Sequence, residues 1–264
     1  MTPATGHSSP GFSLYVRALA FWLVFAATTV IAAILLMLLF PFSLQKRHKF
    51  ITWWVGFILW WLESTCQLRY VVKGTENIPP TGPGIVFAKH QSTWETLALQ
   101  RIFPSQIWVA KRELLWIPFF GWGLAMMKTI AIKRGTGRAA VTQLIREGKE
   151  RLDEGLWIII FPEGTRVPPG KKGRYRIGGA VLAEHSGYPV VPVAHNAGEF
   201  WPRHSFIKRP GTVQVRIGPA INPAGRSAQE IMMDAETWIE TTMAEITTVD
   251  KFQAVSKPAA GKQR

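Results

Sequence analysis

The N-terminal part of the chain contains an apolar stretch that few structures can accommodate. Residues 14–42 carry a single charge, at Arg17, and residues 18–42 carry none. As a helix, this uncharged part is long enough to cross about 30 Å of hydrocarbon. A cleaved signal peptide and two core helices of a soluble domain are the alternatives. The length of the stretch disfavours both, and residues 43–47 contain no small-x-small cleavage site.

A basic cluster and a tryptophan-rich segment follow directly. Residues 46–49 are Lys-Arg-His-Lys, and the apolar residues 50–62 include four tryptophans. Tryptophan favours the membrane–water interface, and basic clusters favour the cytoplasmic side. We therefore predict that residues 14–66 form a membrane-anchoring helical hairpin, or one span followed by an interfacial helix. Residues 1–13 and the basic tail, residues 251–264, are predicted to be disordered.

The composition indicates a polyanionic partner. The chain has 31 Lys and Arg against 17 Asp and Glu, a formal net charge of +14. Nucleic acid and an anionic membrane surface both fit this charge. The twelve Trp and fifteen Phe, many of them near the N-terminus, favour the membrane and not nucleic acid. The single cysteine, Cys66, excludes an internal disulfide framework and a multi-cysteine metal site, so we expect an inert, packed thiol.

Residues 67–250 alternate between short apolar strands and helices, which predicts an α/β domain with a mostly parallel sheet flanked by helices. Ligands of such sheets bind beyond the carboxyl ends of the strands. Candidate polar residues follow the predicted strands there: His90, Lys111, Arg134, Glu163 and His195. The predicted strands are residues 67–73, 85–88, 107–110, 130–132, 156–161, 190–193 and 212–217; the predicted helices are residues 94–101, 139–154, 180–184 and 229–247.

An apolar segment between the third and fourth predicted strands stands apart from this pattern. Residues 114–123 are interrupted by Pro118, Gly121 and Gly123. We expect a non-helical surface segment that faces lipid or forms the wall of a tunnel.

His90 and Glu95 admit two interpretations. A histidine at a strand-to-helix junction, with a carboxylate five residues later, suits a general base whose tautomer the carboxylate fixes. Because five helical residues turn through about 500°, His90 must precede the helix for the two side chains to meet. Alternatively, Ser92 and Glu95 form a capping box at the start of the helix. The two roles are compatible.

A second motif follows the most apolar predicted strand: Phe161-Pro162-Glu163-Gly164-Thr165-Arg166. Glycine permits close approach of the backbone to a ligand, and the arginine fork suits phosphate. A plain turn with a solvated arginine is the alternative.

Four blocks in this order resemble those of the glycerolipid acyltransferases, and most closely the bacterial enzymes that acylate lysophosphatidate. The resemblance covers about residues 65–220 and includes the apolar N-terminal hairpin. It departs at Glu95, where the family usually has aspartate. The blocks are His90-x4-Glu95, Ile132-Lys133-Arg134, the motif of residues 161–166, and Val191-Pro192-Val193.

The resemblance implies a glycerolipid acyltransferase fold and a reaction. An acyl group passes from acyl-CoA or acyl carrier protein to the sn-2 hydroxyl of lysophosphatidic acid, giving phosphatidic acid. His90 acts as general base and Glu95 stabilises it. The same resemblance implies an enzyme of the inner (cytoplasmic) membrane, with its catalytic domain on the cytoplasmic side, and no cofactor beyond the acyl donor. No pair of histidines has metal-ligand spacing, so we predict no metal.

The resemblance also assigns the remaining site residues. Lys111, Arg134 and Arg166 are expected near the acceptor phosphate, where charge-assisted bonds suit a phosphate monoester. Glu163 is expected to bond the glycerol or to hold a basic neighbour. Backbone N–H groups around Gly164 and Thr165 are expected to stabilise the tetrahedral oxyanion.

Three alternatives compete with this function. A phosphate-reading basic set also suits another lysolipid or glycerol-3-phosphate as acceptor. A non-catalytic, membrane-anchored polyanion-binding protein explains the charge and the anchor but not Glu95 and Glu163 beside the basic residues. A serine hydrolase is disfavoured because the chain has no G-x-S-x-G elbow.

Overall fold

The computed structural model describes residues 11–133 and 137–248. The predictions for residues 1–10 and for the tail from 251 lie outside this range. Among the described residues, the helices are α1 (Phe12–Leu38), α2 (Leu44–Cys66), α3 (Trp94–Ile102), α4 (Phe120–Met126), α5 (Arg138–Asp153), α6 (Gly178–Ser186), α7 (Ala197–Phe200) and α8 (Ala228–Ile246), with 3-10 turns η1 (Thr75–Asn77) and η2 (Arg112–Trp116).

The described strands form one seven-stranded sheet in the order β1-β7-β6-β2-β5-β3-β4. Strands β2 to β6 run parallel to one another, whereas β7 is antiparallel to β6 and pairs with β1 in parallel. The mostly parallel α/β sheet is therefore confirmed. The strands are β1 (Leu68–Lys73), β2 (Ile85–Ala88), β3 (Gln106–Lys111), β4 (Ile130–Ile132), β5 (Trp157–Ile160), β6 (Val190–His195) and β7 (Gly211–Ile217).

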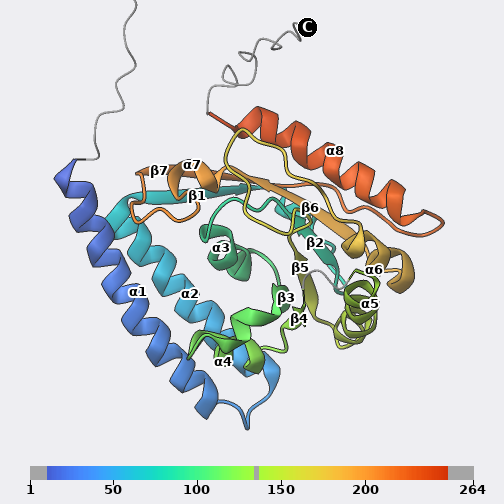
Figure 1. The fold of residues 1–264 in the computed structure, drawn as a ribbon, viewed down its shortest axis with the longest axis horizontal. Helices are drawn as coiled ribbons and strands as arrows, with labels where there is room; N and C mark the ends of the chain where they lie inside the picture. Colours follow the sequence, from blue (N-terminus) through green and yellow to red (C-terminus); the bar gives the residue numbers. More distant parts are fainter. Residues whose placement is uncertain (1–10, 134–136, 249–264) are drawn as a thin grey trace, which may run out of the picture.

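Helices cover both faces of this sheet (Figure 1). Successive side chains of a strand point to opposite faces, so both faces of a buried strand must be apolar. In β2, Val86 packs with residues of α2 and α3, whereas Phe87 packs with residues of α5, α6 and α8. The near-continuous apolar runs of the central strands follow from this double coverage.

The N-terminal hairpin consists of α1 and α2, which lie side by side (Figure 1). Among the described residues, α1 is the one helix long and apolar enough to cross a membrane, and only 22% of its most apolar window is buried. Its exposed side chains include Leu19, Leu23, Ile31 and Ile34. Helix α2 packs instead on α3 and β1, so Ile58 and Leu62 belong to the domain core. The hairpin thus joins a lipid-compatible helix to the α/β domain.

A buried lysine ties α1 to the domain. The Lys208 ammonium lies 4.5 Å and 3.7 Å from the ring centroids of Phe21 and Trp22 on α1, and 4.7 Å from that of Trp201. It donates a hydrogen bond to the Phe206 carbonyl at 3.0 Å. Aromatic faces attract a cation, so this cage fixes α1 against the loop that precedes β7.

The segment of residues 114–123 corrects one prediction. The expectation of a non-helical segment is wrong, because η2 and α4 occupy most of it. Pro118 and Phe119, whose φ is +62°, lie between η2 and α4, so the proline interrupts neither turn, and α4 accommodates Gly121 and Gly123 within it. The segment does lie at the surface, with Trp116, Ile117, Phe120 and Trp122 exposed.

Candidate active site

His90 and Glu95 meet at the carboxyl end of β2, as the general-base interpretation requires. His90 lies on the turn before α3, and its Nδ1 is 2.8 Å from Glu95 Oε1. The Glu95 side chain is fully buried, whereas that of His90 is 14% exposed. Because a carboxylate only accepts hydrogen bonds, Nδ1 carries the proton and donates it. The other ring nitrogen, Nε2, is therefore the one that acts as a base.

Glu95 also closes the turn before α3. Its carboxylate accepts the backbone N–H groups of Gln91 at 3.1 Å and Ser92 at 2.9 Å. Ser92 Oγ accepts the N–H of Trp94, not that of Glu95, so only the glutamate half of a capping box is present. Burial by itself would raise the pKa of Glu95. Hydrogen bonds from His90 and from the Ser92 amide outweigh burial and hold this pKa below its ordinary value.

Aromatic rings fix the plane of the His90 imidazole. The ring stacks on Phe161 with 4.0 Å between centroids and 14° between planes. Phe161 in turn stacks on Trp108 of β3 at 5.8 Å. The stack and the Glu95 bond together leave the imidazole little freedom to rotate.

The backbone of His90 is held from several sides. Its N–H donates to Glu163 Oε2 at 3.0 Å, and its carbonyl accepts the N–H of Val167 at 2.7 Å. One residue earlier, the Lys89 carbonyl lies 2.7 Å from Nε2 of the fully buried His195. His195, a candidate from the sequence, is therefore a buried structural histidine with both ring nitrogens near backbone partners. The His90-x4-Glu95 motif and the motif of residues 161–166 therefore contact each other around His90.

Glu163 is buried and holds a basic neighbour, which is one of its two expected roles. Its Oε1 lies 2.7 Å from Lys89 Nζ and accepts the Gly173 N–H at 3.2 Å. With Oε2 on the His90 amide, both oxygens are engaged within the protein. A bond from Glu163 to the glycerol stays a prediction.

The turn after Glu163 brings basic side chains together. Gly164 has a φ of +66°, and a Cβ there would lie 2.9 Å from Arg176 Nε, so the position needs glycine. The exposed Thr165 accepts a hydrogen bond from Arg203 at 3.5 Å, and Arg166 is half-buried. The Gly164 N–H donates to the Phe161 carbonyl at 2.9 Å, so this amide serves the turn and the oxyanion prediction rests on Thr165.

One further predicted basic residue, Lys111, lies at the same edge of the sheet. Lys111 ends β3, is partly exposed, and pairs with Glu113 at 3.5 Å. Arg134 follows β4 and lies outside the described residues. Among the residues that the structure describes, no group of three His, Cys, Asp or Glu side chains is placed to hold a metal ion.

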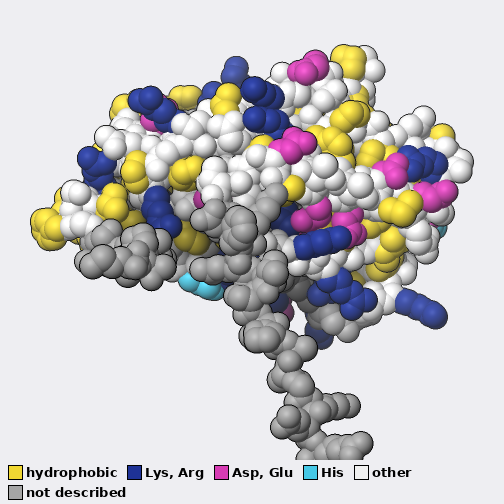
Figure 2. Space-filling model, turned by 90° about the horizontal axis from the view of Figure 1, so that it is seen from above, with side chains coloured by type: hydrophobic (Ala, Val, Ile, Leu, Met, Phe, Trp, Pro, Cys, Tyr) yellow, Lys and Arg dark blue, Asp and Glu magenta, His cyan; other side chains and the backbone are white. Residues whose placement is uncertain are grey.

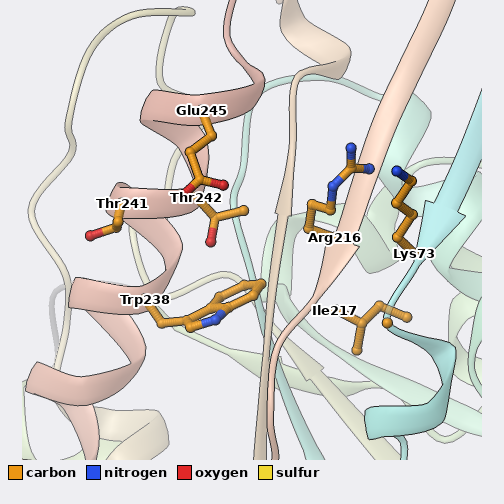
Figure 3. Close-up of a pocket in the computed structure, with 8 residues that line it drawn as sticks. Lys73, Arg216, Ile217, Trp238, Thr241, Thr242 and Glu245 are labelled. Atoms are coloured by element: carbon orange, nitrogen blue, oxygen red, sulfur yellow. The ribbon is translucent and has the colours of Figure 1, made fainter.

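Two cavities lie elsewhere on the protein. One, of about 340 Å³, is bounded by Trp238 and Glu245 of α8 on one side and by Lys73 and Arg216 on the other (Figure 3). The other, of about 410 Å³, lies between the first half of α2 and the loop after α3. Of the described residues that line either cavity, none is His90 or Glu95.

Sequence reasoning missed three residues of the site. The sequence did contain a signal for Lys89, because a charged residue at the end of a buried strand needs partners for its charge. Phe161 also had one, because it is the first residue of the second motif. The sequence contains no signal for Arg203, because its position beside Thr165 depends on the path of the loop before β7.

Comparisons with known proteins show which family the chain resembles. A sequence profile of the Acyltransferase family matches residues 69–196. A 1-acyl-sn-glycerol-3-phosphate acyltransferase of Pseudomonas aeruginosa is 43% identical over 92% of this chain and 95% of its own length. LPAT1, a chloroplastic 1-acyl-sn-glycerol-3-phosphate acyltransferase of Arabidopsis thaliana, is 28% identical over 92% of this chain and 69% of its own.

A solved structure shares the fold. The crystal structure of the 1-acyl-sn-glycerophosphate (LPA) acyltransferase PlsC from Thermotoga maritima covers 89% of this chain and 97% of its own, with a TM-score of 0.74 and 24% identity. The similarity to the Pseudomonas aeruginosa protein extends over nearly the whole of both chains. The chain therefore belongs to the 1-acyl-sn-glycerol-3-phosphate acyltransferase family.

Proposed function

We propose that this acyltransferase transfers an acyl group to the sn-2 hydroxyl of 1-acyl-sn-glycerol-3-phosphate and forms phosphatidic acid, with His90 as general base. The observation that carries the residue assignment is the 2.8 Å contact between His90 Nδ1 and the buried Glu95 carboxylate. The acceptor follows from the names of the relatives. The proposed donor is a thioester, acyl-CoA or acyl carrier protein.

In the proposed reaction, His90 accepts one proton and returns it while one acyl group is transferred. His90 Nε2 takes the proton of the sn-2 hydroxyl while its oxygen attacks the thioester carbonyl carbon. The negative charge moves to the carbonyl oxygen of a tetrahedral intermediate, with the Thr165 amide as the proposed donor to it. The intermediate collapses, the carbon–sulfur bond breaks, and the imidazolium returns its proton to the leaving sulfur. The buried Glu95 carboxylate stabilises the imidazolium between these two steps.

Basic side chains are proposed to bind the acceptor phosphate. Lys111, Arg134 and Arg166 follow three strands whose carboxyl ends share one edge of the sheet, and Arg203 lies beside Thr165. Arginine binds phosphate with two parallel hydrogen bonds, and lysine adds a point charge. Lys and Arg also extend across the width of the face shown in Figure 2, among Asp and Glu, and the formal net charge of +14 favours an anionic donor.

The proposed membrane arrangement places two apolar surfaces against lipid. Helix α1 exposes aliphatic side chains along its length and packs on α4, whose Phe120 and Trp122 are exposed. In the first turn of α2, the Lys46 ammonium lies 4.9 Å from the centroid of the Phe42 ring, which suits the headgroup region. We propose that this end of the molecule binds the inner membrane, with the catalytic domain on the cytoplasmic side.

A substrate panel tests the proposed function. Purified protein is offered lysophosphatidic acid, glycerol-3-phosphate and lysolipids with other headgroups, with labelled acyl-CoA and then acyl carrier protein as donor. We expect labelled phosphatidic acid from lysophosphatidic acid, and the ratio of kcat/KM values between donors identifies the preferred thioester. Faster acylation of another acceptor would assign that acceptor instead, and no labelled product with any acceptor would refute the proposal.

A further inference from the structure

A buried lysine links the catalytic motif to the C-terminal helix. Lys89 directly precedes His90, and its side chain is 1% exposed. Its ammonium lies 2.7 Å from Glu163 Oε1 and also 2.7 Å from Oε1 of Glu240 on α8. Removing an ion from water is costly unless partners surround it, so Lys89 depends on both carboxylates.

The carboxylates in turn collect donors from the loop between β5 and α6. Tyr175 donates its hydroxyl to Glu240 Oε1 at 2.8 Å, and the Gly173 amide donates to Glu163. Lys89 also contacts the Lys171 carbonyl at 3.4 Å. One cation thereby fastens three separate segments: the turn before α3, the loop of residues 171–175, and α8.

Helix α8, which carries Glu240, is packed firmly against the rest of the domain. Ile231 and Ile239 are fully buried in the core on that face of the sheet. The Trp238 indole packs over Gly218, where a Cβ would lie 2.5 Å from the ring, and it points from α8 toward β7 (Figure 3). Glu240 is thus held at a fixed distance from the sheet that carries His90.

We propose that Glu240 is a positioning residue for the acyl transfer, acting through Lys89 and Glu163 on the backbone of His90. Glu163 is shared: one oxygen takes the Lys89 ammonium and the other takes the His90 amide. The second carboxylate, Glu240, fixes where the ammonium lies and therefore where Glu163 lies. A buried ion cluster is weak evidence for stability, so we assign this one a role in geometry. Glu240 lies beyond residues 69–196, the part that the family profile matches.

The test uses a matched pair of substitutions on one helix. Glu240→Gln keeps the shape and one acceptor oxygen but removes the charge. Glu236→Gln, one turn earlier, removes the charge of a glutamate whose partner is the exposed Lys172. Because charge-assisted bonds are roughly twice as strong as neutral ones, we expect Glu240→Gln to lower kcat about tenfold per folded molecule, with KM for the acceptor within about twofold of wild type. Glu236→Gln retains wild-type kcat, and Glu240→Asp lies between Glu240→Gln and wild type.

A second readout does not require turnover. Hydrogen exchange of the peptide that contains the His90 and Ser92 amides becomes faster in Glu240→Gln and stays unchanged in Glu236→Gln. The inference rests on the proposed function for its kinetic arm only. If the wild-type protein acylates no lysolipid, the proposed function fails, while the exchange experiment still tests the contact. Wild-type kcat in folded Glu240→Gln, an equal loss in Glu236→Gln, or unchanged exchange in Glu240→Gln would each overturn the inference.

Discussion

Replacing Glu95 by glutamine separates its two roles. Glutamine keeps one acceptor oxygen, but its NH₂ group replaces Oε2, which accepts the Ser92 N–H at 2.9 Å. The His90 and Gln91 bonds lose their charge assistance. Bonds to charged groups contribute about 1.5–3 kcal/mol and neutral ones about 1 kcal/mol, so the free energy of unfolding should fall by about 2 kcal/mol. Domains are stable by roughly 5–15 kcal/mol, so the variant remains folded.

The effect of Glu95→Gln on turnover should be far larger than its effect on folding. Without the carboxylate, the imidazolium that forms during proton transfer has no neutralising partner. General base catalysis contributes roughly 10²–10⁴-fold, and kcat should fall by a factor in that range with KM for the acceptor nearly unchanged. Initial rates with labelled acyl donor, normalised to the folded fraction from circular dichroism, measure this split.

Glu95→Asp is the matched control, because it keeps the charge on a side chain that is one methylene shorter. Its kcat should exceed that of Glu95→Gln by at least about tenfold, as general base catalysis with an ionised partner predicts. Full kcat in a destabilised Glu95→Gln would show that the residue only closes the turn before α3, and the reasoning would be refuted.

Three further predictions concern the surroundings of the site. Burial lowers the pKa of His195, so the folded protein favours its neutral form. The resulting stabilisation is fully present above the ordinary pKa of about 6.5 and is lost as the pH falls below that value. His195→Gln, which keeps a donor, should flatten the fall in thermal unfolding temperature between about pH 7 and 5; an unchanged slope would exclude His195 as its source. Gly173→Ala would place a Cβ 2.8 Å from Glu163 Oε1 and should cost about 1–3 kcal/mol in denaturant unfolding, whereas Gly178→Ala meets nothing closer than 3.7 Å and should not. Lys208→Ala empties the aromatic cage on α1 and should cost about 2–4 kcal/mol in detergent, and equal stability would show that the cage does not hold α1.

The spacing of apolar residues, and the Gly, Pro and charged residues that bound each apolar run, predicted most of the fold from the sequence. Each predicted strand is present with its bounds shifted by at most a few residues, because apolar runs bounded by Gly, Pro and charged residues have few other structures. Residues 114–123 were the exception: Phe119 adopts an unusual backbone conformation that lets two short helical turns follow each other. No local pattern predicts that conformation for a phenylalanine.

The candidate site was predictable where its residues are close in sequence or follow parallel strands. His90 and Glu95 are five residues apart, and Glu163 follows the neighbouring strand, so spacing and sheet geometry bring them together. The contact between Lys89 and Glu240 spans 151 positions and depends on how α8 packs across the sheet. Tertiary packing of this kind leaves no trace in local sequence, which is why Glu240 was not among the predicted residues.

The most direct test of the account is the turnover of His90→Ala. His185→Ala is its control, because the His185 ring is exposed on α6 and its Nδ1 lies 2.9 Å from the Val181 carbonyl of the same helix. With acyl donor and lysophosphatidic acid, His90→Ala should lose at least about 10²–10⁴-fold in kcat, as expected for removal of a general base, while it binds membranes like wild type. His185→Ala should keep wild-type kcat. Substantial turnover by folded, membrane-bound His90→Ala would contradict the central claim that Nε2 of His90 removes the hydroxyl proton.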